Sequence, residues 1–263
     1  MNIGFIGTGN MGGAIIRSLS GVDGLTVFGV NRTRSRLDAL AAQTGLIPCG
    51  DVQELTEKSD MVVLAVKPQQ VHEVWPALAA ALTKEKLLVS IAAGLTQESL
   101  RQSIGHVCPV VRAMPDTPAL IGEGVTAVCL DDETLSEEQK QGVLSVFRHS
   151  GDVYVLPENL FDAFTAVVGS GPAFIFYFIE TMIESGVELG LERDTASRMV
   201  KKLFRGVSLM AEQSETHVSM LKEMSIAPAG TTIAGLAHFD RTAVRGKIMD
   251  GIRRAYTRSI EMG

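Results

Sequence analysis

The chain has 263 residues, of which 46% are hydrophobic and 21% charged, a composition typical of a globular protein with one large domain or two ordinary ones. Its formal net charge of −6 provides no basic field for a nucleic-acid backbone or an anionic membrane surface, so we expect neither partner. Cys49, Cys108 and Cys129 are far apart without metal-type spacing, no run of about 18 consecutive apolar residues occurs, and the start MNIGFIG lacks a basic export signal. These features predict a cytoplasmic protein without a metal site.

Short apolar runs alternate with amphipathic stretches through the first part of the chain. The runs predict strands over residues 3–6, 25–30, 61–66, 87–92, 107–112, 125–130 and 153–156. The stretches predict helices over residues 12–19, 34–44, 71–82, 97–104 and 137–149, with Ser136 and Gln139 as a capping box for the last of them. Apolar strands that alternate with helices are typical of a largely parallel sheet covered on both faces.

The glycine cluster GTGNMGG follows the first predicted strand and opens the first predicted helix. Its GxGxxG spacing places backbone N–H groups and the positive end of a helix dipole where a pyrophosphate binds. A tight turn between strand and helix is the simpler alternative. We predict an α/β fold in which residues 1–157 form a Rossmann-like dinucleotide-binding domain. The cofactor-binding residues of this loop are predicted to be Ile6, Gly7, Thr8, Gly9, Asn10, Met11 and Gly12.

The second predicted strand ends near Val30, where such domains read the ribose of the nucleotide. The sequence there is VNRTRSR, with uncharged Asn31 in place of an acidic residue. Arg32 is the expected ligand of a 2′-phosphate, and Asn31 and Thr33 are expected beside it, because a guanidinium suits a dianionic phosphate. Arg34 and Arg36 offer further donors to the same phosphate, and a solvated, basic helix start is the alternative for each of them. The pattern favours NADPH, with NADH as the weaker alternative.

A third candidate segment, AVKPQ, follows the predicted strand 61–66 at the edge of the sheet that lines the ligand crevice. Lys67 offers a positive group there, and Pro68 stiffens the loop. A plain turn with a solvated lysine is the alternative. The cofactor-binding residues predicted here are Ala65, Val66, Lys67 and Pro68.

Residues 158–263 have a different pattern and predict an all-helical domain. Their apolar residues recur at helical spacing, as in Phe174, Phe178 and Met182, and again in Met199, Leu203 and Met210. The segment GPAFIFYFIETMIESGVEL is apolar on more than one face, so it needs burial against more than its own domain. We therefore expect an intertwined homo-oligomer, at least a dimer, formed through these helices.

The stretch APAGTT interrupts a helical pattern just before the apolar run 233–239. A helix that starts near Gly230 or Thr231 has free N–H groups, which suit a small carboxylate, and the hydroxyls of Thr231 and Thr232 lie at the same point. A capped turn between two helices explains the same residues without a ligand.

At this point the sequence resembles the Δ1-pyrroline-5-carboxylate reductase family, whose members make L-proline. The resemblance covers essentially the whole chain through FIGTGNMGGAI, AVKPQ, RAMPDTPAL, GSGPAF and LKEMSIAPAGTTIAGL. It implies hydride transfer from NADPH to the C=N bond of the cyclic imine. It also implies that the N–H groups of Gly230 and Thr231 hold the substrate carboxylate, that Glu215 lies close to the substrate, and that the Thr232 hydroxyl, as the catalytic group, hydrogen-bonds the imine nitrogen.

Some residues depart from the family pattern. Ala227 and Ala229 stand where the family has Ser and Gly, so a serine hydroxyl cannot be essential at that position. Asp116 replaces the usual Asn of MPNTP, and it receives no catalytic role here.

Two other functions compete with imine reduction. A β-hydroxyacid dehydrogenase-like oxidoreductase also opens with GxGxMG, but it needs a general-base Lys on its first interdomain helix, and residues 170–184 contain none. A non-catalytic NADPH-binding regulatory protein has no need of a second polar seat such as the GTT sequence.

Overall fold

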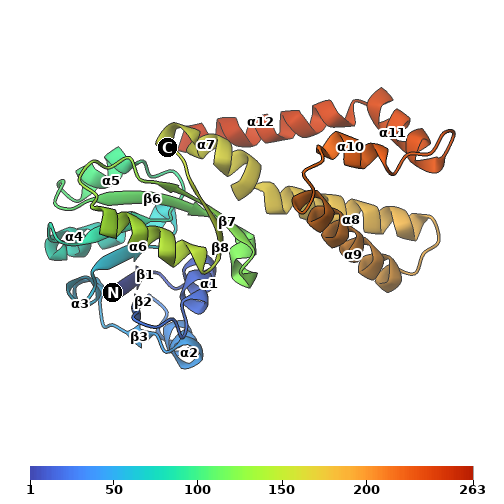
Figure 1. Ribbon diagram of the computed structural model, residues 1–263. Helices are drawn as coiled ribbons and strands as arrows, with labels where there is room; N and C mark the ends of the chain where they lie inside the picture. Colours follow the sequence, from blue (N-terminus) through green and yellow to red (C-terminus); the bar gives the residue numbers. More distant parts are fainter. Residues whose placement is uncertain (263) are drawn as a thin grey trace. The chain divides into compact units, whose positions relative to one another are not determined.

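The computed structural model describes residues 1–262 and divides the chain into two compact units. The first unit comprises Met1–Ser170 together with the end of the chain from Ala255 on, and the second comprises Gly171–Arg254 (Figure 1). The predicted fold class, an α/β dinucleotide-binding domain followed by a helical domain, is confirmed.

The first unit is built on an eight-stranded sheet of order β3-β2-β1-β4-β5-β6-β7-β8. All neighbouring strands run parallel except β6 and β7, which are antiparallel. The strands are β1 (Asn2–Ile6), β2 (Thr26–Val30), β3 (Ile47–Pro48), β4 (Met61–Leu64), β5 (Leu87–Ser90), β6 (Val110–Pro115), β7 (Gly124–Cys129) and β8 (Gly151–Val155). The order reverses direction between β1 and β4, which creates a switch point at the carboxyl ends of these strands.

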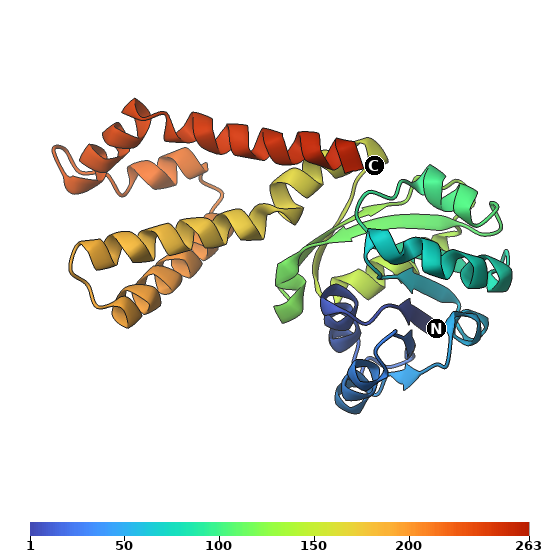
Figure 2. The ribbon, with the colours of Figure 1, turned by 180° about the vertical axis from the view of Figure 1, so that it is seen from behind.

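Helices cover both faces of this sheet, and Figures 1 and 2 show α6 in front of it from one side and α4 with α5 from the other. The helices are α1 (Asn10–Ser18), α2 (Arg34–Thr44), α3 (Val52–Lys58), α4 (Val71–Ala81), α5 (Gln97–Ser103), α6 (Glu137–Arg148) and α7 (Phe161–Phe164). Short 3-10 helices lie at Pro68–Gln70 (η1), Thr117–Ile121 (η2) and Glu158–Leu160 (η3), and a short π-helix (η4) lies at Thr165–Gly169. Ser136 and Gln139 form the predicted capping box of α6.

The two faces carry separate cores because side chains alternate along each strand. Ile3, Phe5 and Val63 belong to the core under α1, α2 and α6, whereas Ile6 and Val62 belong to the core under α3, α4 and α5. Each of these side chains is at most 1% exposed. Burial of such a side chain contributes roughly 1.5–3 kcal/mol, so the apolar runs stabilise the sheet from both sides.

The sequence patterns did not reveal β3 and α3. β3 has only two residues, too few for a recognisable period, and α3 has seven residues in which apolar positions are sparse. α3 depends on its cap, since the Asp51 carboxylate accepts the Glu54 N–H at 2.8 Å. The strand predicted at residues 107–112 runs instead over Val110–Pro115.

The second unit is entirely helical in the described residues. It contains α8 (Gly171–Glu188), α9 (Arg193–Glu212), α10 (Val218–Glu223), α11 (Thr231–Arg241) and the first part of α12 (Val244–Met262). α8 and α9 pack closely, and a Cβ on Gly186 would lie 3.3 Å from that of Ala196. The start predicted for the helix at Gly230 or Thr231 is confirmed.

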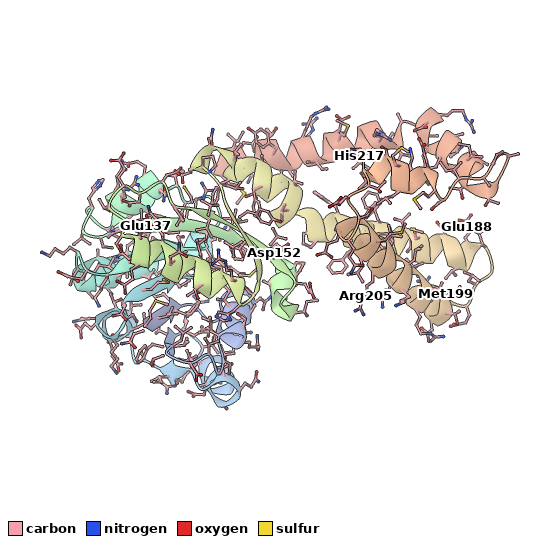
Figure 3. All side chains as sticks on the ribbon, in the orientation of Figure 1. Glu137, Asp152, Glu188, Met199, Arg205 and His217 are labelled. Carbon is pink, nitrogen blue, oxygen red and sulfur yellow. The ribbon has the colours of Figure 1, made fainter. Side chains whose placement is uncertain are left out.

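Much of the apolar surface of this unit is uncovered in a single chain. Phe176 and Tyr177 of α8 are about two-thirds exposed, and the α9 side chains Met199 and Arg205 extend from their helix (Figure 3). Within the helical stretch Glu158–Glu188, a window of 18 residues has a mean hydropathy of 1.5 and only 6% of it is buried, so by length and composition the helix could cross a membrane. One such helix is weak evidence for a membrane, because an apolar helix that packs against another chain has the same composition.

Candidate functional site

A cleft of about 330 Å³ opens at the carboxyl ends of β1, β2 and β4, at the switch point of the sheet. Among the predicted cofactor-binding residues, those that line it are Ile6, Gly7, Thr8, Gly9, Asn31, Arg32, Thr33, Ala65, Val66 and Lys67. Asn10, Met11 and Gly12 lie in the first turn of α1, and Pro68 begins the η1 turn. The cleft therefore unites three segments that are distant in the sequence.

Each glycine of the GxGxxG loop has its own steric reason. Gly7 has a φ of +98°, and a Cβ on it would lie 2.8 Å from the Ala65 carbonyl oxygen. A Cβ on Gly12 would collide with the Gly7 carbonyl oxygen. Gly9 has no protein atom within 4 Å of its Cβ position. Gly7 and Gly12 thus pack strand and helix together, and Gly9 leaves open space at the amino end of α1, which fits a pyrophosphate.

Asn31 organises the second segment. Its side-chain amide donates to the Thr8 hydroxyl at 2.6 Å, and its carbonyl oxygen accepts the Thr33 N–H at 3.2 Å. The uncharged residue that replaces the usual acidic group therefore joins the glycine loop to the turn after β2.

The structure separates the three arginines of this turn. Arg34 pairs with Asp38 at 2.8 Å on the solvent face of α2, whereas Arg32 and Arg36 line the cleft. The sequence predicted Arg32 as the main phosphate ligand and offered Arg36 only as one of three possible donors, without distinguishing it from Arg34. Helical spacing could have distinguished Arg36 from Arg34. Leu37 and Leu40 are buried and mark the side of α2 that faces the sheet, and Arg36 lies next to them because residues four apart share a side of a helix.

Other lining residues come from elements that the motifs did not include. Val30 ends β2, Val52 begins α3, and Gln70, Glu73 and Val74 belong to η1 and α4. Val52 was beyond reach because α3 itself was not predicted.

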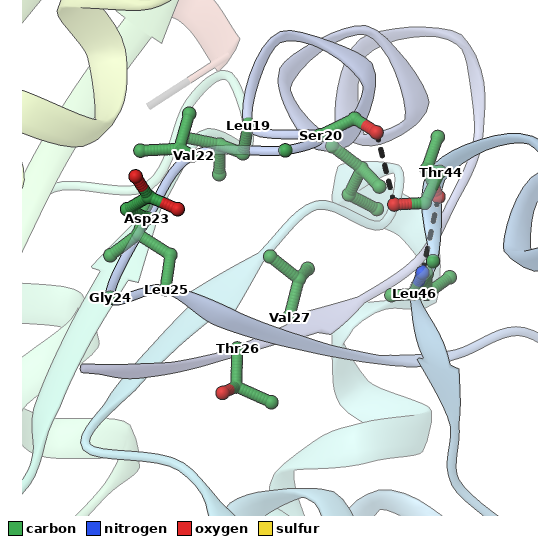
Figure 4. A pocket seen from close by; sticks show the side chains of 13 residues that line it. Leu19, Ser20, Val22, Asp23, Gly24, Leu25, Thr26, Val27, Thr44 and Leu46 are labelled. Atoms are coloured by element: carbon green, nitrogen blue, oxygen red, sulfur yellow. Dashed lines mark hydrogen bonds between the residues drawn. The ribbon is translucent and has the colours of Figure 1, made fainter.

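A second hollow, of about 320 Å³, lies at the opposite end of β2 (Figure 4). The Ser20 hydroxyl donates to the Thr44 carbonyl at 3.0 Å, and the Leu46 N–H donates to the Thr44 hydroxyl at 3.3 Å. Asp23 is the one charged residue among those that line it, so an anionic nucleotide has no favourable partner there.

In the second unit, the amino end of α11 has the form expected for a carboxylate seat. Gly230 is its N-cap residue and has no side chain to accept an N–H, and Thr231 and Thr232 are exposed in the first turn. The Gly230 N–H donates to the Ala227 carbonyl at 3.0 Å, so it already has an acceptor within its own turn. The N–H groups that follow it lack intrahelical acceptors by helix geometry. Glu215 is exposed in the connection between α9 and α10.

Ala229, directly before this N-cap, has a φ of +55°, a conformation that favours glycine. Ala229→Gly is expected to raise the free energy of unfolding by about 0.5–1 kcal/mol, because relief of the left-handed strain exceeds the added chain entropy of glycine. Urea unfolding measures the change as a higher midpoint at constant slope. Ala243→Gly, at φ +56°, tests the same cause at a second position and should show a similar gain in the free energy of unfolding. A lower midpoint for Ala229→Gly would contradict the strain.

Asp116 lies in the first unit and is 6% exposed. Its carboxylate accepts the Val125 N–H at 2.9 Å, which ties the turn before η2 to β7. Burial raises the pKa of this carboxyl above its ordinary value, although the Val125 N–H acts in the opposite direction. Asp116 therefore has a structural role that an asparagine oxygen also provides.

The raised pKa of Asp116 makes the stability of this unit depend on pH. The folded chain binds the proton more tightly than the unfolded chain, so the free energy of unfolding falls as pH rises from the unfolded pKa, about 4, through the folded one. Asp116→Asn should remove this slope and stabilise the protein at pH 7 by on the order of 1 kcal/mol. Thermal unfolding of both proteins at pH 4 and pH 7 checks it. Equal pH slopes would contradict the assignment to Asp116.

Both parts of the chain match families of known proteins. Residues 158–262 match the family model described as pyrroline-5-carboxylate reductase dimerisation, and residues 2–94 match the one described as NADP oxidoreductase coenzyme F420-dependent. A pyrroline-5-carboxylate reductase from Methanosarcina acetivorans is 34% identical over 99% of this chain and 97% of its own length. The enzyme of that name from Escherichia coli is 32% identical over 98% of this chain and 96% of its own length.

Solved structures give the same result. A pyrroline-5-carboxylate reductase from Coxiella burnetii matches with a TM-score of 0.91 and 32% identity, covering 100% of this chain and 98% of that one. The pyrroline carboxylate reductase of Plasmodium falciparum, solved with NADP bound, matches with a TM-score of 0.90 and 29% identity, with the same coverage. The chain belongs to the pyrroline-5-carboxylate reductase family.

Proposed function

We propose that this protein is a pyrroline-5-carboxylate reductase, which reduces the C=N bond of Δ1-pyrroline-5-carboxylate to give L-proline, the last step of proline biosynthesis. The observation that carries the proposal is the full-length identity to enzymes of that name, together with a cleft built from the glycine loop, the Arg32 turn and the Lys67 loop. This identity favours the reductase over a β-hydroxyacid dehydrogenase. Residues 1–157 form its cofactor domain and residues 158–263 its dimerisation and substrate domain.

The cleft fits NADPH. Gly9 leaves room for a pyrophosphate at the start of α1, and Arg32 and Arg36 supply donors for the 2′-phosphate. Asn10, Met11 and Gly12 contribute the N–H groups of the first helical turn, Ala65, Val66 and Lys67 line the cleft, and Pro68 stiffens the turn that follows them. When bound, NADPH supplies the hydride that reduces the imine carbon. NADH lacks the 2′-phosphate and is the weaker cofactor.

The substrate residues are those at the amino end of α11 and the connection before α10. The Thr231 N–H and the neighbouring groups of the first turn hold the substrate carboxylate, and Gly230 lets it approach because it has no side chain. The Thr232 hydroxyl donates a hydrogen bond to the ring nitrogen, which becomes a better acceptor as the C=N bond is reduced. Glu215 contributes a negative charge that favours the protonated imine.

The exposed apolar faces of α8 and α9 support assembly as a homo-oligomer, at least a dimer. A groove of about 450 Å³ on α9 is lined by Met199, Leu203, Val207 and Met210. Patches of this kind on a single chain mark surfaces that another chain covers. Sedimentation at micromolar concentration checks the assembly, and a monomer would contradict it.

The protein is proposed to act in the cytoplasm. Cys49, Cys108 and Cys129 are free and buried, as suits a reducing compartment. Burial raises the pKa of Cys108 and of Cys129 to about 12, so both thiols are inert core residues.

A turnover assay tests the function. The purified full-length protein, mixed with Δ1-pyrroline-5-carboxylate, should oxidise NADPH and release an equal amount of proline. NADPH binding without turnover would favour a regulatory protein instead, and the absence of turnover with both NADPH and NADH would contradict the proposal.

A further inference from the structure

The loop between β5 and α5, residues 91–96, lies beside the cleft. Its first residue, Ile91, donates its N–H to the Leu64 carbonyl at 3.1 Å, and Ala65, which follows Leu64, lines the cleft. Dinucleotides bind across the switch point, with one half on each side of it. Since Arg32 follows β2 on one side, the nicotinamide half belongs over β4 and β5 on the other. The 91–96 loop is therefore positioned for that half.

At Gly94 a distant part of the chain meets this loop. Gly94 has a φ of +78°, and a Cβ on it would lie 2.8 Å from the carbonyl oxygen of Met262 and 3.8 Å from its Cβ. The backbone of the last turn of α12 thus packs directly on the loop. Glycine alone allows both the conformation and the approach.

The last turn of α12 is anchored at a second point. The Ser259 hydroxyl donates to the Asp162 carboxylate at 2.6 Å, in a partly buried contact between residues 97 positions apart. Asp162 belongs to α7, and Figure 1 shows the end of α12 beside that helix. Phe161, next to Asp162, is fully buried, so α7 is a firm support.

The turn directly before α7 also holds the far end of the 91–96 loop. Glu158, just before α7, accepts the Gln97 N–H at 2.7 Å at the start of α5. It also pairs at 3.3 Å with Arg112, which is 7% exposed and lies 4.8 Å above the Phe161 ring. Both ends of the loop are hydrogen-bonded, and the contact between Gly94 and Met262 restrains its middle.

We propose that Gly94 and the last turn of α12, held by Ser259 and Asp162, are positioning residues for the nicotinamide half of the cofactor. They act through the 91–96 loop and leave the phosphate-binding half untouched. This inference rests on the proposed function for the identity of the cofactor. Preorganisation of this kind is effective because a displacement of about 1 Å near a reacting group can cost up to 100-fold in rate.

The experiment compares binding of NADPH with binding of 2′-phospho-ADP-ribose, which lacks nicotinamide, by calorimetry on the full chain without substrate. Gly94→Ala should raise the Kd of NADPH at least fivefold and change the Kd of 2′-phospho-ADP-ribose less than twofold, on the scale set by misplaced contacts. Gly24→Ala is the matched control, because Gly24 has a φ of +77° with no atom within 4 Å of its Cβ position. It should carry the same backbone strain and leave both Kd values unchanged.

A second pair of variants tests the anchor and remains informative if Gly94→Ala fails to fold. Asp162→Ala should raise the Kd of NADPH without raising that of 2′-phospho-ADP-ribose. Asp162→Asn keeps an acceptor for the Ser259 hydroxyl and should bind NADPH with wild-type affinity. Equal weakening of both ligands, or wild-type NADPH affinity in Asp162→Ala, overturns the inference. Because no substrate is used, either result is independent of whether the protein reduces pyrroline-5-carboxylate.

Discussion

Replacement of Thr232 by alanine is expected to lower kcat/KM for Δ1-pyrroline-5-carboxylate by about 10- to 100-fold, the scale of one hydrogen bond to a group whose charge changes in the transition state. Thr232 is exposed in the first turn of α11, where its hydroxyl is available to a ligand. The loss should fall mainly on kcat, because the bond to nitrogen strengthens as the imine is reduced. Steady-state kinetics at saturating NADPH measure it.

Two further substitutions at the same position distinguish the loss of the hydroxyl group from a change in side-chain shape. Thr232→Ser keeps the donor and should retain activity within a few-fold, while Thr232→Val keeps the shape and should be as impaired as alanine. The Kd of NADPH should be unaffected in all three variants, since the cofactor residues belong to the first unit. Unchanged kinetics in Thr232→Ala would remove this residue from the reaction.

Arg32→Ala is expected to raise the KM for NADPH by about 10- to 100-fold while the KM for NADH changes little, because a charge-assisted pair with the 2′-phosphate is worth roughly 1.5–3 kcal/mol. Arg32 lines the cleft directly after β2, beside Asn31, which is hydrogen-bonded to the glycine loop. The cofactor preference should therefore shift toward NADH, as measured by the ratio of kcat/KM values.

Arg34→Ala is the matched control. The substitution removes the same charge two residues away, and the Arg34 side chain pairs with Asp38 on the solvent face of α2. Its effect should be limited to weak, salt-dependent changes. Arg36 lines the cleft as well, so Arg36→Ala should have an effect of the same kind as Arg32→Ala. If the KM values for NADPH and NADH rise equally in Arg32→Ala, the phosphate is recognised elsewhere.

Local patterns predicted most of the fold. The apolar runs of β1, β4 and β5 predicted a sheet buried on both faces, and the helix α2 has the bounds predicted for it. The capping box at Ser136 and the helix start at Gly230 were also predicted from neighbouring residues. These features succeed because their causes lie within a few residues of one another.

The sequence by itself determined the glycine loop, the basic turn after β2 and the threonines of α11, since each depends on residue type and short spacing. Only the tertiary structure decided that Arg36 faces the cleft while Arg34 does not, that the buried Asp116 carboxylate accepts an N–H from β7, and that the Met262 backbone packs against Gly94. Such contacts join segments far apart in the chain. Their geometry follows from packing, which no local pattern encodes.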